Sequence, residues 1–443
     1  MAAVIPSMSC YDFEYRDSTG DDVGLPDAQP GVLIVAEEAD MSRFTLFGVA
    51  CVFALAGCDS NSSPDPLVDT NTSISWPGES WQTSTPELEG LDGEAVAKLN
   101  EEFRAGKHGY VDSMLIVRNG RLAFEAYYEN DYRTINKELM TDESGPYNYY
   151  DASWHPFYNF SDLHTMQSTT KSFMSALVGI AVARGDLPGV EATLSELLPH
   201  RKISDPEKAA ITLHNILTMR SGFEWEEFVS YWDPRNDAIA VESTDDWVAY
   251  LLAKPLADVQ GTVFNYNSIS TQLMSEMVST ATGRGLGDYA EEFLFGPIGI
   301  TDYFWKTAPE GIKDVSGGLY LKPRDLARFG LLFERGGEWN GKQIVSAEWV
   351  AKSSGPIVAD VWPENTEYKR GYGYQWWIYK HGTDGKPFMY GTSGWGGQFA
   401  LIVPELNLVG VFTGWRVYEG PRSRSAVELF YDRVVLPAFL RQQ

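Results

Sequence analysis

Cysteine is nearly absent from this chain of 443 residues. The three cysteines are Cys10, Cys51 and Cys58, so the chain beyond them can hold neither a disulfide framework nor a thiolate metal site. Histidine is scarce as well, and none of the six histidines forms the His-Glu-x-x-His pattern of a zinc protease. From these absences we expect no metal ion and no other cofactor.

Basic side chains are fewer than acidic ones. The chain has 35 Lys and Arg residues and 61 Asp and Glu residues, for a net charge of −26. Such a surface repels nucleic acid, so we expect no nucleic-acid partner. The chain also lacks a Gly-x-Ser-x-Gly sequence, which disfavours the catalytic serine of an α/β-hydrolase. Apolar sequence is plentiful: 44% of the residues are hydrophobic, enough for a large packed core.

An apolar run near the N-terminus is typical of a targeting signal. From Met41 a short basic start leads into apolar residues and then into small residues before Cys58. The run is too short to span a membrane and fits a secretory signal peptide over residues 41–58. Its end, Leu55-Ala56-Gly57-Cys58, is similar to a bacterial lipobox, in which the cysteine becomes the lipidated first residue of the mature protein. The alternatives are an ordinary signal peptide or a buried strand.

The signal predicts where the protein resides. We expect Cys58 to carry lipid and to anchor the mature protein to a membrane of the bacterial cell envelope, facing the periplasm or the exterior. Residues 1–40 precede the signal and would serve no purpose in a secreted protein. We interpret them as a spurious extension that arises from a start codon assigned too early. Residues 59–92 follow the signal, begin with a polar and Pro-rich stretch, and are predicted to form a flexible tether.

Residues 93–443 are predicted to form one domain with strands near both ends. Asn119-Gly120 lies between two alternating runs, which is a strong hairpin signal. Near the C-terminus, two apolar runs around Pro404–Asn407 predict a second hairpin. The expected elements here are a helix over Gly93–Ala105, strands over Ser113–Arg118, Arg121–Tyr128, Gln398–Val403 and Leu408–Gly414, and a closing helix over Ala426–Leu440.

The middle of the chain, about residues 185–310, is predicted to be mainly helical. Helical spacing of apolar residues occurs over Ile211–Arg220, Trp247–Leu252 and Thr271–Thr282. The expected fold class is therefore α+β, with an antiparallel sheet flanked by helices and an inserted, mainly helical subdomain. A site would lie where the two meet, which is a common place for pockets.

A Ser-x-x-Lys sequence, Ser168-Thr169-Thr170-Lys171, opens a long apolar helical run. Residues three apart on a helix are neighbours on one face, so the Ser168 hydroxyl and the Lys171 amine should lie side by side. A serine becomes a good nucleophile when a base takes its proton, and a lysine serves as that base when burial keeps it neutral. This pattern predicts a serine nucleophile that needs no histidine.

Two further stretches carry chemistry. Tyr266-Asn267-Ser268 follows a loop, and a tyrosine hydroxyl beside a lysine ammonium can carry a proton. Gly391–Gln398 is rich in glycine and precedes a predicted strand. Glycines there let the backbone approach a substrate, and backbone N–H groups can form an oxyanion hole.

The order of these three stretches resembles the serine β-lactamase and penicillin-binding-protein superfamily. Within it, the chain is most similar to class C β-lactamases, their esterase relatives and the 6-aminohexanoate-dimer hydrolases. Ile211–Gly222 and Gly317–Gly330 support the resemblance, which covers about residues 95–440. It implies a β-lactamase/transpeptidase-like fold.

The resemblance also implies a role for each residue. Ser168 would attack a carbonyl and form an acyl-enzyme, while Lys171 and Tyr266 would share the proton transfers; which of the two is the base stays open. The backbone N–H groups of Ser168 and Trp395 would form the oxyanion hole. Contacts to the substrate would come from Asn267, Ser268, Ser393 and Gly394.

Two departures from the family pattern bear on the substrate. Thr392-Ser393-Gly394 stands where β-lactamases carry Lys-Thr-Gly, and Ser268 replaces the asparagine of Tyr-x-Asn. Both changes favour a serine hydrolase that cleaves a small ester or amide. One alternative is a β-lactamase or a peptidoglycan DD-peptidase. Another is a non-catalytic, penicillin-binding-like module of the envelope, which the intact Ser168, Lys171 and Tyr266 argue against.

Overall fold

The computed structural model describes residues 75–135, 156–229, 233, 235–363, 369–382, 386, 388–415 and 425–442. These residues belong to one compact unit. The proposed extension, the signal peptide and Cys58 lie outside them, and so do Cys10 and Cys51.

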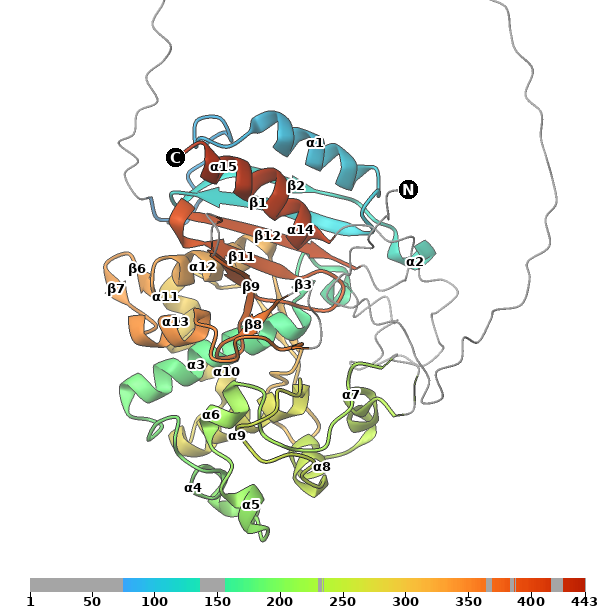
Figure 1. Cartoon of the computed structure of the whole chain (residues 1–443), viewed down its shortest axis with the longest axis vertical. Coiled ribbons are helices and arrows are strands. Elements are labelled where there is room, and N and C mark those ends of the chain that lie inside the picture. Colours follow the sequence, from blue (N-terminus) through green and yellow to red (C-terminus); the bar gives the residue numbers. More distant parts are fainter. Residues whose placement is uncertain are drawn as a thin grey trace, which may run out of the picture. The chain divides into compact units, whose positions relative to one another are not determined.

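A seven-stranded antiparallel sheet joins the two ends of the domain (Figure 1). The strand order β2-β1-β12-β11-β10-β9-β8 places the first hairpin beside the last strands of the chain. In register, Leu115 of β1 lies opposite Val411 of β12. The strands are β1 (Val111–Arg118), β2 (Arg121–Tyr127), β8 (Gly371–Tyr372), β9 (Trp377–His381), β10 (Phe388–Gly391), β11 (Phe399–Val403) and β12 (Leu408–Gly414).

Both predicted hairpins are confirmed. The turn between β1 and β2 places Asn119 at φ 53° and Gly120 at φ 78°, the left-handed conformations that Asn-Gly adopts at low cost. Between β11 and β12, a 3-10 turn over Pro404–Leu406 leads to Asn407, also left-handed at φ 49°. The predicted helix at the start of the domain is confirmed as α1 (Gly93–Arg104), which Asp92 caps.

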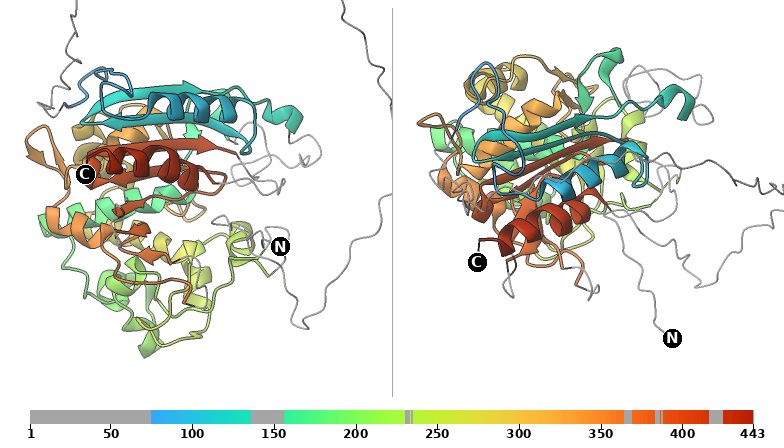
Figure 2. Two further views of the ribbon diagram at one scale, coloured as in Figure 1. Left: turned by 45° about the horizontal axis from the view of Figure 1, so that its top comes forward. Right: turned by 90° about the horizontal axis from the view of Figure 1, so that it is seen from above.

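Helices cover both faces of the sheet (Figure 2). Met114 and Ile116 of β1 belong to the core under α1, while Leu115 and Val117 belong to the core on the other face, as alternation along a strand requires. On the first face lie α1, α14 (Ala426–Phe430) and α15 (Leu436–Leu440), with a π-helical turn over Tyr431–Val435 between the last two. On the second face, α12 (Pro323–Glu334) packs on β1, β11 and β12.

Residues 75–92 correct one prediction, since they were expected to belong to the tether. The Ser75 backbone N–H donates to the Asn119 carbonyl at 3.1 Å, and the Leu122 N–H donates to Gln82 at 2.8 Å. Trp81 is buried, with 7% of its surface exposed. The polar composition of the segment concealed this packing, because Trp76, Trp81 and a few backbone bonds are enough to fix it on the domain.

The helical part of the molecule centres on two long helices, α3 (Thr170–Arg184) and α9 (Ser268–Thr282), which pack together. The helix predicted over Ile211–Arg220 is shorter than expected: α6 spans Leu213–Leu217, because Met219 is left-handed at φ 56° and ends it. Shorter helices complete this part: α4 (Leu194–Leu197), α5 (Pro206–Ala209), α7 (Asp237–Ala240), α8 (Trp247–Ala253), α10 (Leu286–Ala290), α11 (Gly296–Ile298) and α13 (Ala347–Ser354).

A second, small sheet ties the chain just before α3 to the loop that follows α11. Its order is β3-β5-β4, with His164 opposite Leu321. The strands are β3 (His164–Thr165), β4 (Phe304–Trp305) and β5 (Leu319–Leu321); a separate hairpin consists of β6 (Glu338–Trp339) and β7 (Lys342–Gln343), and α2 spans Tyr132–Ile135. This small sheet fixes two segments near Ser168: β3, which precedes it, and β5, which follows the loop of Ser316.

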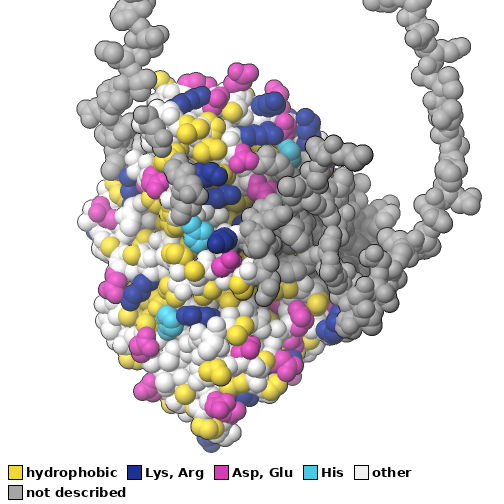
Figure 3. Space-filling view, viewed as in Figure 1, with side chains coloured by type: hydrophobic (Ala, Val, Ile, Leu, Met, Phe, Trp, Pro, Cys, Tyr) yellow, Lys and Arg dark blue, Asp and Glu magenta, His cyan; other side chains and the backbone are white. Residues whose placement is uncertain are grey.

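Acidic and basic side chains are interspersed over the face of the molecule in Figure 3. Among the helices of the described residues, none combines the length and the apolar character that crossing a membrane requires.

Candidate active site

Ser168 lies in a 3-10 turn, Gln167–Thr169, that leads from β3 directly into α3. The residue before it, Gln167, is buried and left-handed at φ 46°, a conformation that costs a non-glycine residue free energy. Strain of this kind persists where the surrounding structure fixes it, and such positions cluster at functional sites. Ser168 itself is half-buried and keeps access to solvent.

The predicted neighbourhood of Ser168 and Lys171 is confirmed. The Lys171 ammonium nitrogen, Nζ, lies 2.9 Å from the Ser168 Oγ and donates to the carbonyl oxygen of Ser316 at 2.5 Å. Lys171 is buried, with 1% of its surface exposed. The carbonyl fixes the direction of the amine, so the lysine is held against the Ser168 hydroxyl by contacts with two segments of the chain.

Burial lowers the pKa of Lys171 from 10.5 to about 8, because the charged form loses its hydration. The carboxylates of Glu227 and Asp314 oppose this effect, since a negative charge nearby favours the ammonium. A pKa near 8 leaves a useful fraction of the amine neutral at physiological pH. Lys171 therefore has both the geometry and the protonation state of a general base.

Tyr266 reaches the same place from the start of α9. The Lys171 Nζ lies 5.2 Å from the centroid of its ring, and the tyrosine is 7% exposed. The structure thus brings together Ser168, Lys171 and Tyr266, from the turn before α3, α3 itself and the chain just before α9.

Asn267 and Ser268 have structural partners that the sequence did not indicate. The Asn267 side chain caps α9 by accepting from the Ser270 N–H at 2.8 Å, and its Nδ2 has no hydrogen-bond partner among the described residues. The Ser268 hydroxyl donates to Glu227 at 2.5 Å, and the Ser268 N–H donates to the same carboxylate at 2.9 Å. That both residues contact the substrate stays a prediction.

The glycine-rich loop after β10 lies against the nucleophile turn. A Cβ on Gly394 would stand 2.3 Å from the carbonyl oxygen of Met166, so only glycine fits there. Thr169, the neighbour of Ser168, donates to the Gln398 carbonyl at 3.0 Å. These contacts bring the loop beside Ser168; an oxyanion hole formed by the N–H groups of Ser168 and Trp395 stays a prediction, as does the substrate contact of the buried Ser393.

Gln398 was missed by the sequence analysis. Its buried side-chain amide donates to the carbonyl oxygens of Trp395 at 2.9 Å and Gly414 at 2.6 Å. The Gly414 N–H donates back to the same side chain at 3.3 Å. One side chain thus ties the Trp395 loop to the end of β12. A glutamine three residues after the tryptophan gives no signal of this role in a single sequence.

Asp314 was missed as well. Its buried carboxylate accepts from the Ser316 N–H at 2.9 Å, the Ser316 hydroxyl at 2.6 Å and the Gly317 N–H at 3.1 Å. These bonds shape the loop whose Ser316 carbonyl receives Lys171. Glu227 is the third omission: it lies in the loop after α6 and is the carboxylate with the largest effect on the pKa of Lys171.

The family model described as Beta-lactamase matches residues 96–428. The chain belongs to the β-lactamase family. This family belongs to the superfamily of serine β-lactamases and penicillin-binding proteins that the ordered motifs resemble, and its α+β fold is the one predicted from the sequence.

Known relatives of this β-lactamase-family chain are distant. A 6-aminohexanoate-dimer hydrolase from Paenarthrobacter ureafaciens is 24% identical over 52% of this chain and 60% of its own length. Among solved structures, a family VIII carboxylesterase superposes with a TM-score of 0.56 at 17% identity, over 82% of this chain and 99% of the other. Simvastatin synthase from Aspergillus terreus gives a TM-score of 0.55 at 16% identity, over 79% and 99%. The two structures share the fold.

Thr392 is the residue that the motif resemblance matches to the lysine of Lys-Thr-Gly in β-lactamases. Its hydroxyl oxygen accepts from the Ala400 N–H at 2.9 Å and lies 3.1 Å from the Thr169 hydroxyl. The side chain is fully buried. Its hydroxyl therefore links β10's end to β11 and to the turn of Ser168, and it supplies no charge to the site.

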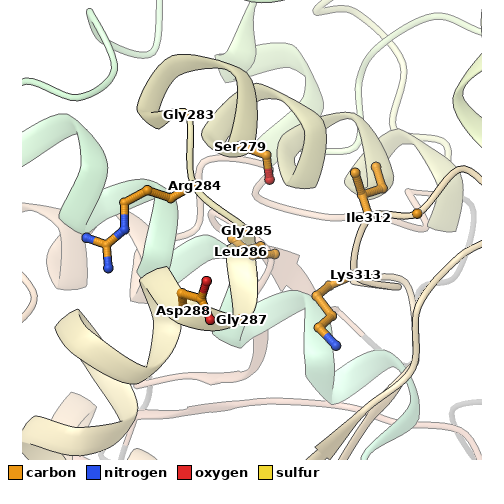
Figure 4. A pocket seen from close by; sticks show the side chains of 10 residues that line it. Ser279, Gly283, Arg284, Gly285, Leu286, Gly287, Asp288, Ile312 and Lys313 are labelled. Carbon is orange, nitrogen blue, oxygen red and sulfur yellow. The ribbon is translucent and has the colours of Figure 1, made fainter.

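A separate hollow of about 430 Å³ lies between the end of α9, the start of α10 and residues 311–313 (Figure 4). Its two cations are engaged away from it: Arg284 donates to Glu292 at 2.6 Å, and Lys313 donates to the Trp305 carbonyl at 3.0 Å. In the close-up the two side chains point away from one another. None of its lining residues belongs to the Ser168 site.

Proposed function

We propose that this protein is a serine hydrolase that cleaves a small ester or amide through an acyl-enzyme on Ser168. The observation that carries the proposal is the buried Lys171 amine, 2.9 Å from a half-buried serine hydroxyl. A serine beside a lysine whose pKa is lowered to about 8 has the two parts that nucleophilic catalysis needs.

The steps follow from this geometry. The Ser168 Oγ forms a bond to the substrate carbonyl carbon while its proton passes to the Lys171–Tyr266 pair. The tetrahedral intermediate then collapses, the bond to the leaving group breaks, and the pair returns the proton to the departing alcohol or amine. Water attacks the acyl-enzyme by the same proton path in reverse, which releases the acid and restores Ser168.

The charges of the site favour an uncharged substrate. A β-lactam carries a carboxylate, and Thr392 offers no cation to pair with it. Glu227 adds a negative charge beside Tyr266, held by Ser268. The missing charge-assisted bond is worth on the order of 1–3 kcal/mol to an anionic substrate and nothing to a neutral ester. Relatives named as a carboxylesterase and a dimer hydrolase are consistent with ester or amide chemistry.

Location is part of the proposal and rests on the lipobox-like sequence before Cys58. The protein would be a lipoprotein of the bacterial envelope, with its domain outside the cytoplasm. In the native host, a Cys58→Ser precursor should leave the detergent phase on phase partitioning or stay unprocessed. Unchanged partitioning of the variant would contradict a lipid anchor at this cysteine.

Two labelling reactions test the proposed chemistry. Label on Ser168 from a fluorophosphonate but not from fluorescent penicillin is the expected result. Label from both reagents would favour a β-lactamase or DD-peptidase, and label from neither would favour a non-catalytic envelope module. In turnover, kcat/KM for p-nitrophenyl butyrate should exceed that for nitrocefin, and the reverse order would overturn the ester preference.

A further inference from the structure

We infer that the aromatic side chains around Tyr266 form a subsite for a flat, apolar leaving group, so that aryl esters and aryl amides are the preferred substrate class. The inference rests on the proposed function and adds the substrate class to it. Its members come from the sheet and from the helical part of the molecule. They are Phe228, Phe264, Tyr266, Trp362, Tyr372 and Trp377, called the aromatic shell below.

The Tyr266 ring lies between two partners at offset-stacking distance. Phe228, in the loop after α6, has its ring centroid 5.8 Å from that of Tyr266, with 36° between the planes. Trp377, on β9, lies 5.7 Å away at 31°. Aromatic rings favour such close contacts, and a flat ring in a leaving group would contact the solvent-exposed parts of Phe228 and Trp377 in the same way.

Trp377 extends the shell outward. Trp362 stacks on it at 5.9 Å, while Phe264 and Tyr372 present ring edges at 6.3 Å and 5.0 Å. Met219 and Val361 complete an apolar cluster around these rings.

Most rings of the aromatic shell keep part of their surface in solvent. Phe228, Phe264, Trp362 and Trp377 are each half-buried, whereas Tyr372 behind them is 1% exposed. Apolar rings that keep part of their surface in solvent gain free energy when a ligand covers them.

The proton transfer to the leaving group is the reason to assign the leaving group to the aromatic shell. The proton for the leaving group comes from the Lys171–Tyr266 pair, and we assign the departing oxygen or nitrogen to the Tyr266 side of that pair. The rest of the leaving group then meets the side chains that surround Tyr266. We assign the acyl group, which stays bound to Ser168 after the leaving group departs, to the opposite side of the site. The aromatic shell is therefore expected to favour esters and amides by their leaving group, and to have no effect on the preference for one acyl group over another.

A double comparison of two acetates tests this inference. 2-Naphthyl acetate and 2,2,2-trifluoroethyl acetate form the same acetyl-enzyme, so only their leaving groups differ. The ratio of their kcat/KM values should fall roughly three- to tenfold in Trp377→Leu and in Phe228→Leu, the scale of one lost aromatic contact. Because the ratio within each variant is compared with that of the wild type, intrinsic differences in ester reactivity cancel.

Two controls test whether the effect is specific to the aromatic shell and to the leaving group. Tyr127→Leu removes an exposed aromatic ring on β2, outside the shell, and should leave the ratio unchanged. The ratio of ethyl 2-naphthoate to ethyl acetate, which moves the ring to the acyl side, should also stay unchanged in Trp377→Leu. An unchanged leaving-group ratio in both shell variants, or an equal fall on the acyl side, would overturn the inference.

A binding measurement separates the subsite from the proposed chemistry. 2-Naphthol, the leaving group alone, should bind to Ser168→Ala, and Trp377→Leu in that background should raise its Kd roughly threefold or more. If no ester is turned over at Ser168 while 2-naphthol still binds in this way, the proposed function fails and the aromatic subsite stands. If esters are turned over but 2-naphthol binding does not depend on Trp377 and Phe228, the subsite fails alone.

Discussion

Two buried lysines, Lys171 and Lys306, make an instructive pair. They are 1% and 4% exposed, and burial lowers the pKa of each from 10.5 to about 8. Each lies over a tyrosine ring, Lys171 at 5.2 Å from Tyr266 and Lys306 at 5.6 Å from Tyr320. The Asp314 carboxylate raises the pKa of both, against the effect of burial.

The two differ in what else they meet. Lys171 lies 2.9 Å from the hydroxyl of Ser168, which keeps access to solvent. Beside Lys306, the Tyr320 ring is fully buried, and burial raises the pKa of its hydroxyl far above the usual value. A lowered lysine pKa is therefore not a sufficient sign of a catalytic base. It becomes one where the amine touches a nucleophile that a substrate can reach.

Removal of the nucleophile should have the largest effect. Ser168→Ala should abolish turnover of p-nitrophenyl butyrate, because it removes the hydroxyl that lies 2.9 Å from the Lys171 amine and that is proposed to form the acyl-enzyme. Circular dichroism would check that the fold is retained. Full activity in a folded variant would refute the assigned nucleophile.

Removal of the proton path should come next. Lys171→Ala and Tyr266→Phe should each lower kcat by at least ~10²-fold, the scale of lost general acid–base catalysis. Since the two residues act as a unit, the double variant should lose less than the product of the single losses. Steady-state kinetics of the three variants measures this, and losses that simply multiply would mean separate proton paths.

Neutralisation of Glu227 should shift the pH profile rather than abolish activity. Its carboxylate stabilises the ammonium form of Lys171, so Glu227→Gln should lower the pKa of Lys171 further below its usual value. The rising limb of kcat/KM against pH, with a midpoint near 8 in the wild type, should move to lower pH. Glu226→Gln, at the exposed neighbouring position, is the matched control and should leave the limb in place.

Lys306→Met should have the smallest effect on activity, with kcat/KM and its pH limb close to wild type. Its effect falls on stability. Because the pKa of Lys306 is lowered by burial, the wild-type fold should gain free energy of unfolding from pH 7 to pH 10 as this lysine becomes neutral, and Lys306→Met should lack that gain. Denaturant unfolding at both pH values tests this, and an activity loss as large as that of Lys171→Ala would erase the contrast between the two lysines.

The sequence predicted those parts of the fold and site that local patterns specify. Alternating runs around Asn119-Gly120 specify a hairpin, and Ser-x-x-Lys specifies the contact of Ser168 with Lys171, because both depend on residues close in the chain. Gln398, Asp314 and Glu227 were missed because their roles depend on partners that only the folded chain brings near. The tether was misjudged over residues 75–92 for the same reason: its partners, Asn119 and Leu122, lie on a distant hairpin.

The helix expected over Ile211–Arg220 shows a different limit of prediction from sequence. Periodicity over this stretch is helical, but tertiary structure places Met219 in a left-handed conformation and the helix ends at Leu217. The Asn265 N–H then donates to the Met219 carbonyl at 2.8 Å, just before Tyr266. The helix ends early here, and the Met219 carbonyl instead holds the segment that carries Tyr266.

The central claim is that a neutral Lys171 activates Ser168. The rate of fluorophosphonate labelling as a function of pH tests this claim most directly. The second-order rate constant would be measured for the wild type and for Lys171→Met, and peptide mass spectrometry would locate the label. The account predicts label on Ser168, a wild-type rate that rises with pH with a midpoint near 8, and a variant that labels slowly and without that limb. Label on another residue, or a Lys171→Met protein with the wild-type rate and pH profile, would contradict it.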